Sequence, residues 1–161
     1  MKTLYISRHA EAEPDLNTDF SRCLTMEGEQ EADWLGKYLL KHDVKIDIVL
    51  SSSAKRALST ANIVIQQAQL PPENLIIIPE LYNAKLETLL EMIRTLDNKY
   101  THPLLVAHNP GLSNLAHYLI DADVGHLPTC GFCGFNLTIE SWDELQKGIG
   151  QLMLMSYPGA L

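Results

Sequence analysis

The chain has 161 residues, of which 46% are hydrophobic, and 20 acidic residues against 12 Lys and Arg give it a formal charge of −8. A chain of this length can bury a core without disulfides or a structural metal, so we expect residues 1–161 to form a single domain. The acidic balance argues against nucleic acid and anionic membranes as partners, and no apolar run reaches the length of a signal sequence or membrane span, which favours a cytoplasmic location.

Short apolar, β-branched runs that end in polar residues predict buried strands. They cover Thr3–Ser7, Ile46–Leu50, Leu75–Ile78 and Pro103–Ala107. Apolar residues recur with helical spacing over Glu27–Lys41, Ala54–Ala68, Leu86–Leu96 and Leu112–Ile120. This alternation predicts an α/β fold, a three-layer αβα domain with a mostly parallel central sheet. Two further strand-like runs, Phe132–Ile139 and Gln151–Tyr157, are separated only by a turn region and predict an antiparallel C-terminal strand pair.

Polar residues with phosphate-binding chemistry follow several of the predicted strands. The carboxyl ends of parallel strands meet at one edge of a sheet, where ligands usually bind. The first strand brings Arg8 and His9 to this edge, the second is followed by Ser51–Ser53 and Arg56, and the fourth brings His108. Arg56 stands in the first turn of its predicted helix, where the helix dipole disfavours a cation. A bound anion would resolve this conflict, because helix amino termini and guanidinium groups both bind phosphate.

Five short motifs, in chain order, resemble those of the histidine phosphatase superfamily, the phosphoglycerate-mutase-like group. They are Arg8-His9-Ala10, Leu24-Thr25 with Gly28, Ser51–Ala57 with Thr60-Ala61, Pro79-Glu80-Leu81, and His108-Asn109-Pro110. The short chain, with one predicted helix between Leu81 and His102, resembles the small branch typified by the phosphohistidine phosphatase SixA. Arg22 stands where SixA-like members place a further phosphate-binding arginine. The family triplet is usually Arg-His-Gly, so Ala10 departs from the pattern.

The resemblance implies a phosphatase that needs no metal and no cofactor and that forms a phosphohistidine intermediate on His9. The implied phosphate-binding residues are Arg8, Arg22, Arg56 and a protonated His108. A histidine nucleophile must be neutral at the attacking nitrogen. We therefore expect the neighbouring cations to lower the pKa of His9, and a backbone carbonyl to fix its tautomer.

The proton donor for the leaving group is less well defined by the sequence. Glu80 follows the third predicted strand, where larger family members resemble one another in carrying this donor, and such a carboxyl needs a raised pKa. A solvated loop carboxylate is the alternative interpretation of Glu80, and Glu11 and Glu13 are alternative donors.

The expected partner is a phosphorylated protein, above all a phosphohistidine domain, because a chain without an inserted subdomain should have an open site. Two alternatives stay open. One is a small-molecule phosphomonoesterase of the same superfamily, and the other is a phosphate-binding or phosphoprotein-binding module with weak turnover, for which Ala10 is the hint.

The cysteine spacing gives no second functional site. Cys130 and Cys133 have the spacing of half a zinc site, but the chain contains no second cysteine pair. We interpret them as small buried thiols and predict no metal site.

Overall fold

A computed structural model of the chain describes residues 1–14 and 18–159. The strands are β1 (Lys2–Arg8), β2 (Ile48–Ser51), β3 (Leu75–Ile77), β4 (Pro103–Ala107), β5 (Phe132–Leu137) and β6 (Gly150–Ser156). The α-helices are α1 (Met26–Lys41), α2 (Lys55–Ala68), α3 (Leu86–Arg94) and α4 (Gly111–Ile120). Each helix and strand predicted from the sequence is present, with its ends within 2 residues of the expected ones. Within the described ranges, no helix combines the length and apolar character needed to cross a membrane.

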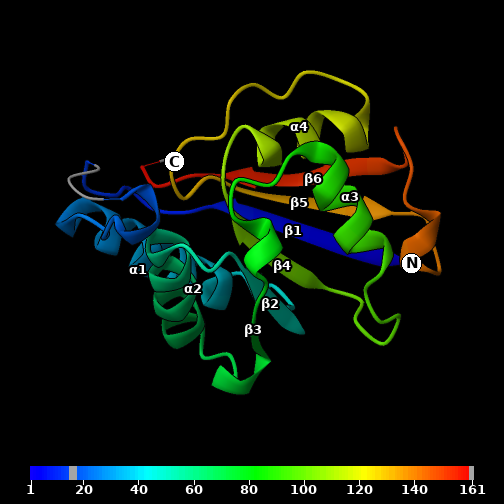
Figure 1. The fold of residues 1–161 in the computed structure, drawn as a ribbon. Helices are drawn as coiled ribbons and strands as arrows, with labels where there is room; N and C mark the ends of the chain where they lie inside the picture. Colours follow the sequence, from blue (N-terminus) through cyan, green and yellow to red (C-terminus); the bar gives the residue numbers. More distant parts are fainter. Residues whose placement is uncertain (15–17, 160–161) are drawn as a thin grey trace.

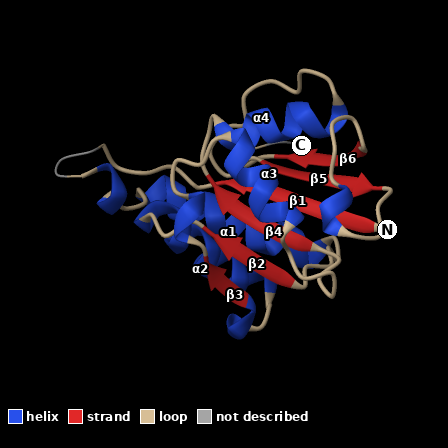
Figure 2. Cartoon of the chain, turned by 45° about the vertical axis from the view of Figure 1, so that its right-hand side comes forward, coloured by secondary structure: helices blue, strands red, loops and turns tan. Residues whose placement is uncertain are grey.

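The strands form one 6-stranded sheet in the order β3-β2-β4-β1-β5-β6 (Figure 1). The first four strands in this order run parallel, whereas β5 runs antiparallel to β1, and β6 runs antiparallel to β5. Figure 2 shows the twisted sheet with helices on both sides. The structure thus confirms the three-layer αβα domain, its mostly parallel sheet and the antiparallel C-terminal strand pair.

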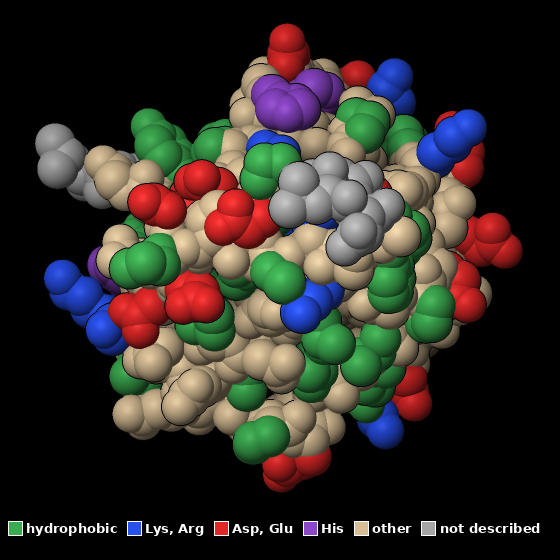
Figure 3. Space-filling model, turned by 60° about the vertical axis from the view of Figure 1, so that its left-hand side comes forward, with side chains coloured by type: hydrophobic (Ala, Val, Ile, Leu, Met, Phe, Trp, Pro, Cys, Tyr) green, Lys and Arg blue, Asp and Glu red, His purple; other side chains and the backbone are tan. Residues whose placement is uncertain are grey.

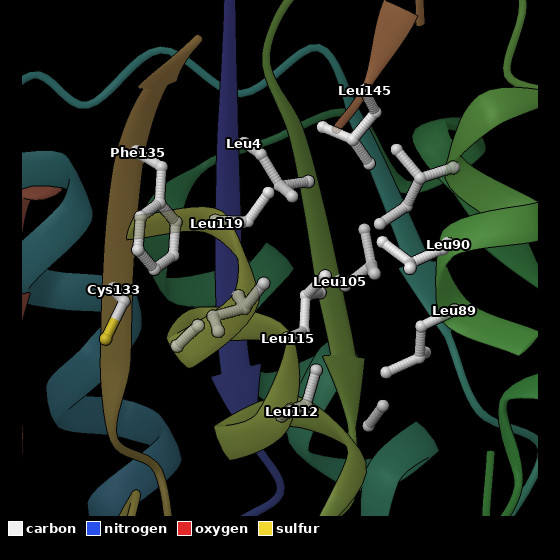
Figure 4. Packing of buried hydrophobic residues seen from close by; sticks show 14 of the residues in the cluster. Leu4, Leu89, Leu90, Leu105, Leu112, Leu115, Leu119, Cys133, Phe135 and Leu145 are labelled. Carbon is white, nitrogen blue, oxygen red and sulfur yellow. The ribbon is translucent and has the colours of Figure 1, made fainter. Parts of the chain in front are cut away.

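Two hydrophobic clusters, one on each face of the sheet, follow from the alternation of side chains along the strands. In β1, Leu4 and Ile6 pack toward α3 and α4, whereas Tyr5 packs toward α1 and α2. Figure 4 shows the first cluster, where strand and helix residues meet, among them Leu4, Leu105, Phe135, Leu89, Leu90, Leu112, Leu115 and Leu119. A slip by one residue would exchange the two faces of a strand, so this packing fixes which residue stands at each strand end.

The third strand differs from its prediction. The run Leu75–Ile78 was expected to be buried, but β3 is an edge strand, and Ile76 and Ile77 are 43% and 47% exposed. β3 is short and pairs with β2 alone. Strand hydrophobicity indicates β-structure but cannot show which strand lies at the edge.

The segment after β1 folds back against the amino end of α1. Thr25 caps α1 by accepting a hydrogen bond from the Gly28 N–H at 2.9 Å, and the Thr25 N–H donates to the Glu11 carbonyl at 3.1 Å. Ala12 and Leu24 form an isolated antiparallel bridge. A Cβ atom on Gly28 would lie 2.0 Å from the Glu11 carbonyl oxygen. Glycine therefore allows this backbone to lie directly on the helix.

We expect Gly28→Ala to lower the free energy of unfolding by about 1–3 kcal/mol, because its methyl group would push the Glu11 backbone away from α1. Urea unfolding followed by circular dichroism measures the change. The control is Gln30→Ala, at an exposed position of the same helix. Equal stability of the two variants would show that this contact does not constrain the loop.

Candidate active site

Two histidines and an arginine from three separate elements meet at the carboxyl edge of the sheet. His9 follows β1 and His108 follows the adjacent β4, and the His9 N–H donates to the Ala107 carbonyl at 3.0 Å. The two imidazole rings are buried, with their centroids 5.3 Å apart. Arg56, in the first turn of α2, donates from Nε to His9 Nε2 at 3.3 Å. Both rings are thus within reach of a single phosphate-sized anion.

The hydrogen bonds of His9 assign its tautomer. Nδ1 lies 2.7 Å from the Ala10 carbonyl oxygen, so this nitrogen carries the proton and donates it. Nε2 then holds the lone pair and accepts from Arg56. The Ala10 N–H donates to Thr60 Oγ1 at 2.9 Å, and the Ala10 methyl is buried without requiring a positive φ. Alanine in place of the family glycine is therefore accommodated, and the backbone carbonyl expected to orient His9 is that of Ala10.

Both histidines are held neutral. Burial, together with the charges of Arg56 and Arg8, lowers the pKa of His9 to about 4. Burial also lowers the pKa of His108 to about 3, with contributions from Arg56 and His9. Without a bound anion, His108 is therefore neutral near neutral pH, and its protonated form beside a phosphoryl group stays a prediction. Burial, more than the neighbouring cations, is the principal cause of both shifts, and its extent could not be read from the sequence.

Arg8 and Arg22 extend the positive charge around His9. Arg8 donates from Nη1 to the Leu127 carbonyl at 3.2 Å, from the loop that precedes β5. Arg22 donates from Nε to the Glu13 carbonyl at 2.7 Å. The charges of both arginines lower the pKa of His9. The structure thus brings all five predicted cationic or imidazole groups, His9, Arg8, Arg22, Arg56 and His108, into one electrostatic cluster.

Two buried side-chain atoms in this cluster, Arg8 Nε and His108 Nδ1, have no hydrogen-bond partner among the residues that the structure describes. His108 Nε2 is paired, because it lies 2.8 Å from Ser52 Oγ. Buried polar atoms are rarely left without partners, because each costs about 1–3 kcal/mol. Their position beside His9 therefore points to a polar ligand.

The amino end of α2 also lacks the usual capping groups. Its N-cap, Ala54, offers no side-chain hydrogen bond, and its first turn contains no acidic residue but instead contains Lys55 and Arg56.

Figure 3 looks toward the carboxyl ends of the strands and shows acidic side chains gathered on one part of this face, with Lys and Arg reaching the surface in small separate areas. The arginines beside His9 are buried or half-buried, in a protein whose net charge is −8.

Sequence reasoning missed two residues of the cluster, Asp19 and Tyr82. The Asp19 carboxylate accepts hydrogen bonds from Arg22, Arg56 and the Tyr82 hydroxyl, the last at 2.6 Å. The Tyr82 ring packs edge-on against His108, with centroids 5.7 Å apart. The spacing of Asp19 and Arg22, three residues apart, was the one available signal, whereas no pattern pointed to Tyr82.

The three candidate proton donors do not join the cluster through contacts of their carboxylates. Glu80 is exposed in the turn Pro79–Leu81, two residues before Tyr82, and among the described residues its carboxylate has no hydrogen bond or ion pair. Glu11 and Glu13 are also exposed, and they contact their neighbours through backbone atoms.

Cys130, in the turn before β5, and Cys133, within β5, lie in the protein interior. Cys130 and Cys133 are free and buried, and burial raises the pKa of both thiols, that of Cys133 to about 12. Residues 1–14 and 18–159 contain no group of three or more His, Cys, Asp or Glu side chains placed to hold a metal ion.

Comparison with known proteins gives both a family and a fold. A model of the histidine phosphatase superfamily (branch 1) matches residues 4–103. A search of curated proteins finds no match. Among solved structures, the protein histidine phosphatase SixA complexed with tungstate has a TM-score of 0.84 at 24% identity, with 97% of each chain covered. A Nakamurella multipartitia protein that bears the name phosphohistidine phosphatase SixA gives the same TM-score and identity, over 99% of this chain and 97% of that chain.

A more distant likeness is to phosphoserine phosphatase from Entamoeba histolytica in complex with 3-phosphoglyceric acid. Its TM-score is 0.69 at 16% identity, over 99% of this chain and 98% of that chain. At such identities, the structural likeness shows a shared fold, whereas the family model rests on sequence.

We expect Arg56→Gln to raise the pKa of both His9 and His108, because the guanidinium charge opposes protonation of both rings. Titration of the imidazole signals by NMR over the acid range measures the shifts. Lys37→Gln is the control, since Lys37 is exposed and ion-paired with Asp33. A wild-type His9 that titrates near the ordinary value of about 6.5 would contradict the buried, neutral imidazole.

Proposed function

The chain belongs to the histidine phosphatase superfamily, and on that premise we propose that it is a metal-independent phosphatase that forms a phosphohistidine on His9. One observation carries the proposal. His9 Nε2 holds a lone pair beside Arg56, in a cluster where Arg8 Nε and His108 Nδ1 are buried without partners among the described residues. A phosphoryl group would supply acceptor oxygens to the unpaired donors and an electrophilic phosphorus to the lone pair.

In the first step, His9 Nε2 attacks phosphorus in line, and the bond from phosphorus to the leaving group breaks with its electron pair. Charge on the equatorial oxygens is stabilised by Arg8, Arg22 and Arg56. His108 adjoins the same oxygens. A phosphoryl dianion beside the ring favours its protonated form, so His108 would gain a proton as the substrate binds.

In the second step, water attacks the phosphorus of the phosphohistidine, and the P–N bond breaks with its electrons returning to Nε2. The Ala10 carbonyl holds the Nδ1 proton through both steps. His9 therefore leaves as the same neutral tautomer that began the reaction, which completes the cycle without a proton transfer at Nδ1.

We propose a protein phosphohistidine as the substrate. The Asp19 carboxyl is the acidic group inside the cluster, and its pKa is lowered to about 2, first by the hydrogen bond from Tyr82, so it is ionised and a poor acid. An imidazole leaving group needs less help from a strong donor than an alkoxide does. The fold shared with SixA supports the same choice.

A small phosphomonoester is the second candidate, and one cavity favours it. A cavity of about 550 Å³ lies between residues 83–87 and 109–114, immediately after Tyr82 and His108 in the chain. Its volume falls within the range of small-molecule sites, about 300–1,000 Å³. Lys85, Asn109 and Asn114 line it and could bind a polar leaving group.

The proposed function is tested with a phosphohistidine protein and a chromogenic phosphomonoester, both assayed with EDTA present. His9→Ala should abolish phosphate release, and Arg56→Ala should weaken oxyanion binding by about 2 kcal/mol, the scale of a lost charge-assisted contact. Lys41→Ala, at the exposed carboxyl end of α1, is the control for loss of a cation and should retain activity.

Three results would count against the proposal. Turnover in His9→Ala would exclude this nucleophile, and loss of activity in EDTA that a divalent ion restores would exclude the metal-independent mechanism. Tight phosphate binding without release by the wild type would instead identify a binding module.

We also propose that Glu80 is the proton donor, and a comparison of the two substrates tests this role. We expect Glu80→Gln to lower kcat/KM for an alkyl phosphomonoester by at least about tenfold, while sparing the phosphohistidine protein, because the two leaving groups differ in their need for a proton. Glu73→Gln, in another exposed turn, is the control. Equal losses on both substrates would assign Glu80 a structural or uniform binding role.

A further inference from the structure

The Asp19 carboxylate forms ion pairs with Arg22 and Arg56, two of the three arginines that the proposed reaction uses. Its Oδ1 lies 3.2 Å from Arg22 Nη1, and its Oδ2 lies 3.1 Å from Arg56 Nη2. The Asp19 backbone carbonyl accepts a further bond from Arg56 Nη1 at 2.8 Å. One residue thus provides three anionic or carbonyl oxygens to two guanidinium groups.

Every side-chain nitrogen of Arg56 already donates a hydrogen bond. Nε donates to His9, and Nη1 and Nη2 donate to Asp19. A guanidinium binds phosphate through two neighbouring nitrogens. Nη1 and Nη2 each carry a second N–H, but whichever pair a phosphoryl group engages includes a nitrogen that already donates to Asp19. The phosphoryl group and Asp19 therefore compete for the charge of the same guanidinium.

Asp19 is the partner best placed to leave. Its side chain is 40% exposed, whereas that of Arg56 is 5% exposed. Asp19 also lies in a short turn, Asp19–Ser21, rather than in a helix or strand of the sheet. Hydrogen bonds from Tyr82 and Arg22 and the charge of Arg56 lower the pKa of Asp19 to about 2, so the group that would leave is an anion at neutral pH.

We propose that Asp19 is an internal counter-anion, which exchanges with the phosphoryl group on Arg56 and Arg22 as substrate binds and returns as phosphate leaves. This inference rests on the proposed function, since it concerns the same phosphate site. A cluster of three arginines without such a competitor would bind its inorganic phosphate product tightly. The tethered carboxylate weakens that binding and speeds product release.

The test measures binding of inorganic phosphate, and separately tungstate, by calorimetry to the wild type and to Asp19→Asn. Loss of the competing charge should tighten binding of both oxyanions about tenfold, the scale of one partly screened charge a few ångströms away. Product inhibition by phosphate should strengthen by the same factor, with kcat lowered when release limits turnover. Tyr82→Phe loses one bond to Asp19 but no charge, and should tighten binding less.

Asp143→Asn controls for the change in net charge. Asp143 is exposed in the turn Trp142–Glu144, near the start of β1, where Lys2 Nζ lies 5.5 Å from the Trp142 ring centroid. This variant should bind phosphate as the wild type does. The melting temperatures of all variants are measured alongside, to separate loss of fold from loss of binding.

The outcomes distinguish the inference from the function on which it rests. Unchanged or weaker oxyanion binding in a folded Asp19→Asn, with a wild type that binds and hydrolyses normally, would overturn the counter-anion role and make Asp19 an orienting residue for the arginines. A wild type that binds neither phosphate nor tungstate would overturn the phosphate site itself, and the exchange with it.

Discussion

The hydrogen bond from Arg56 Nε to His9 Nε2 is the contact around which the site is arranged. A buried guanidinium is costly unless each of its donors finds an acceptor. Here the acceptors come from the end of β1 and from the loop that precedes α1, so satisfying Arg56 fixes where that loop lies. The same bond requires a lone pair on Nε2, and therefore a proton on Nδ1. The Nδ1–H donates a hydrogen bond to the Ala10 carbonyl. One buried cation thus sets both the shape of the site and the protonation of its candidate nucleophile.

Much of this arrangement could be predicted from the sequence because it depends on periodicity. Apolar runs that alternate with helices predict that β1 and β4 belong to one parallel sheet, so that His9 and His108, which follow them, lie at the same edge. The structure adds that the two strands are adjacent. Arg56 could be placed because it stands in the first turn of the helix that follows β2. These are local patterns whose spatial consequence is fixed by sheet geometry.

The rest depends on contacts between distant segments, which no local pattern encodes. Asp19 reaches Arg56 across 37 positions and Tyr82 across 63, because the loop folds onto α1 where Gly28 leaves room for it. The neutral state of His108 arises first from burial and then from the charge of Arg56. Likewise, the exposure of β3 follows from its place in the strand order and not from its composition.

The direction of β5 has a consequence for the extent of the catalytic unit. An antiparallel strand beside β1 must start at the edge where the parallel strands end, so the segment that leads into β5 passes the site. In this segment, the Cys130 N–H donates to the carbonyls of Arg8 and His9. The Leu127 carbonyl accepts a hydrogen bond from the Arg8 side chain. The family model matches residues 4–103, and the last family-like motif ends at Pro110, so neither reaches β5. A shortened chain that kept every recognisable motif but ended after α4 would therefore lose the backbone donor that holds His9 in place and the acceptor that orients Arg8. The residues that hold His9 and Arg8 in place therefore extend beyond the segment that matches the family model.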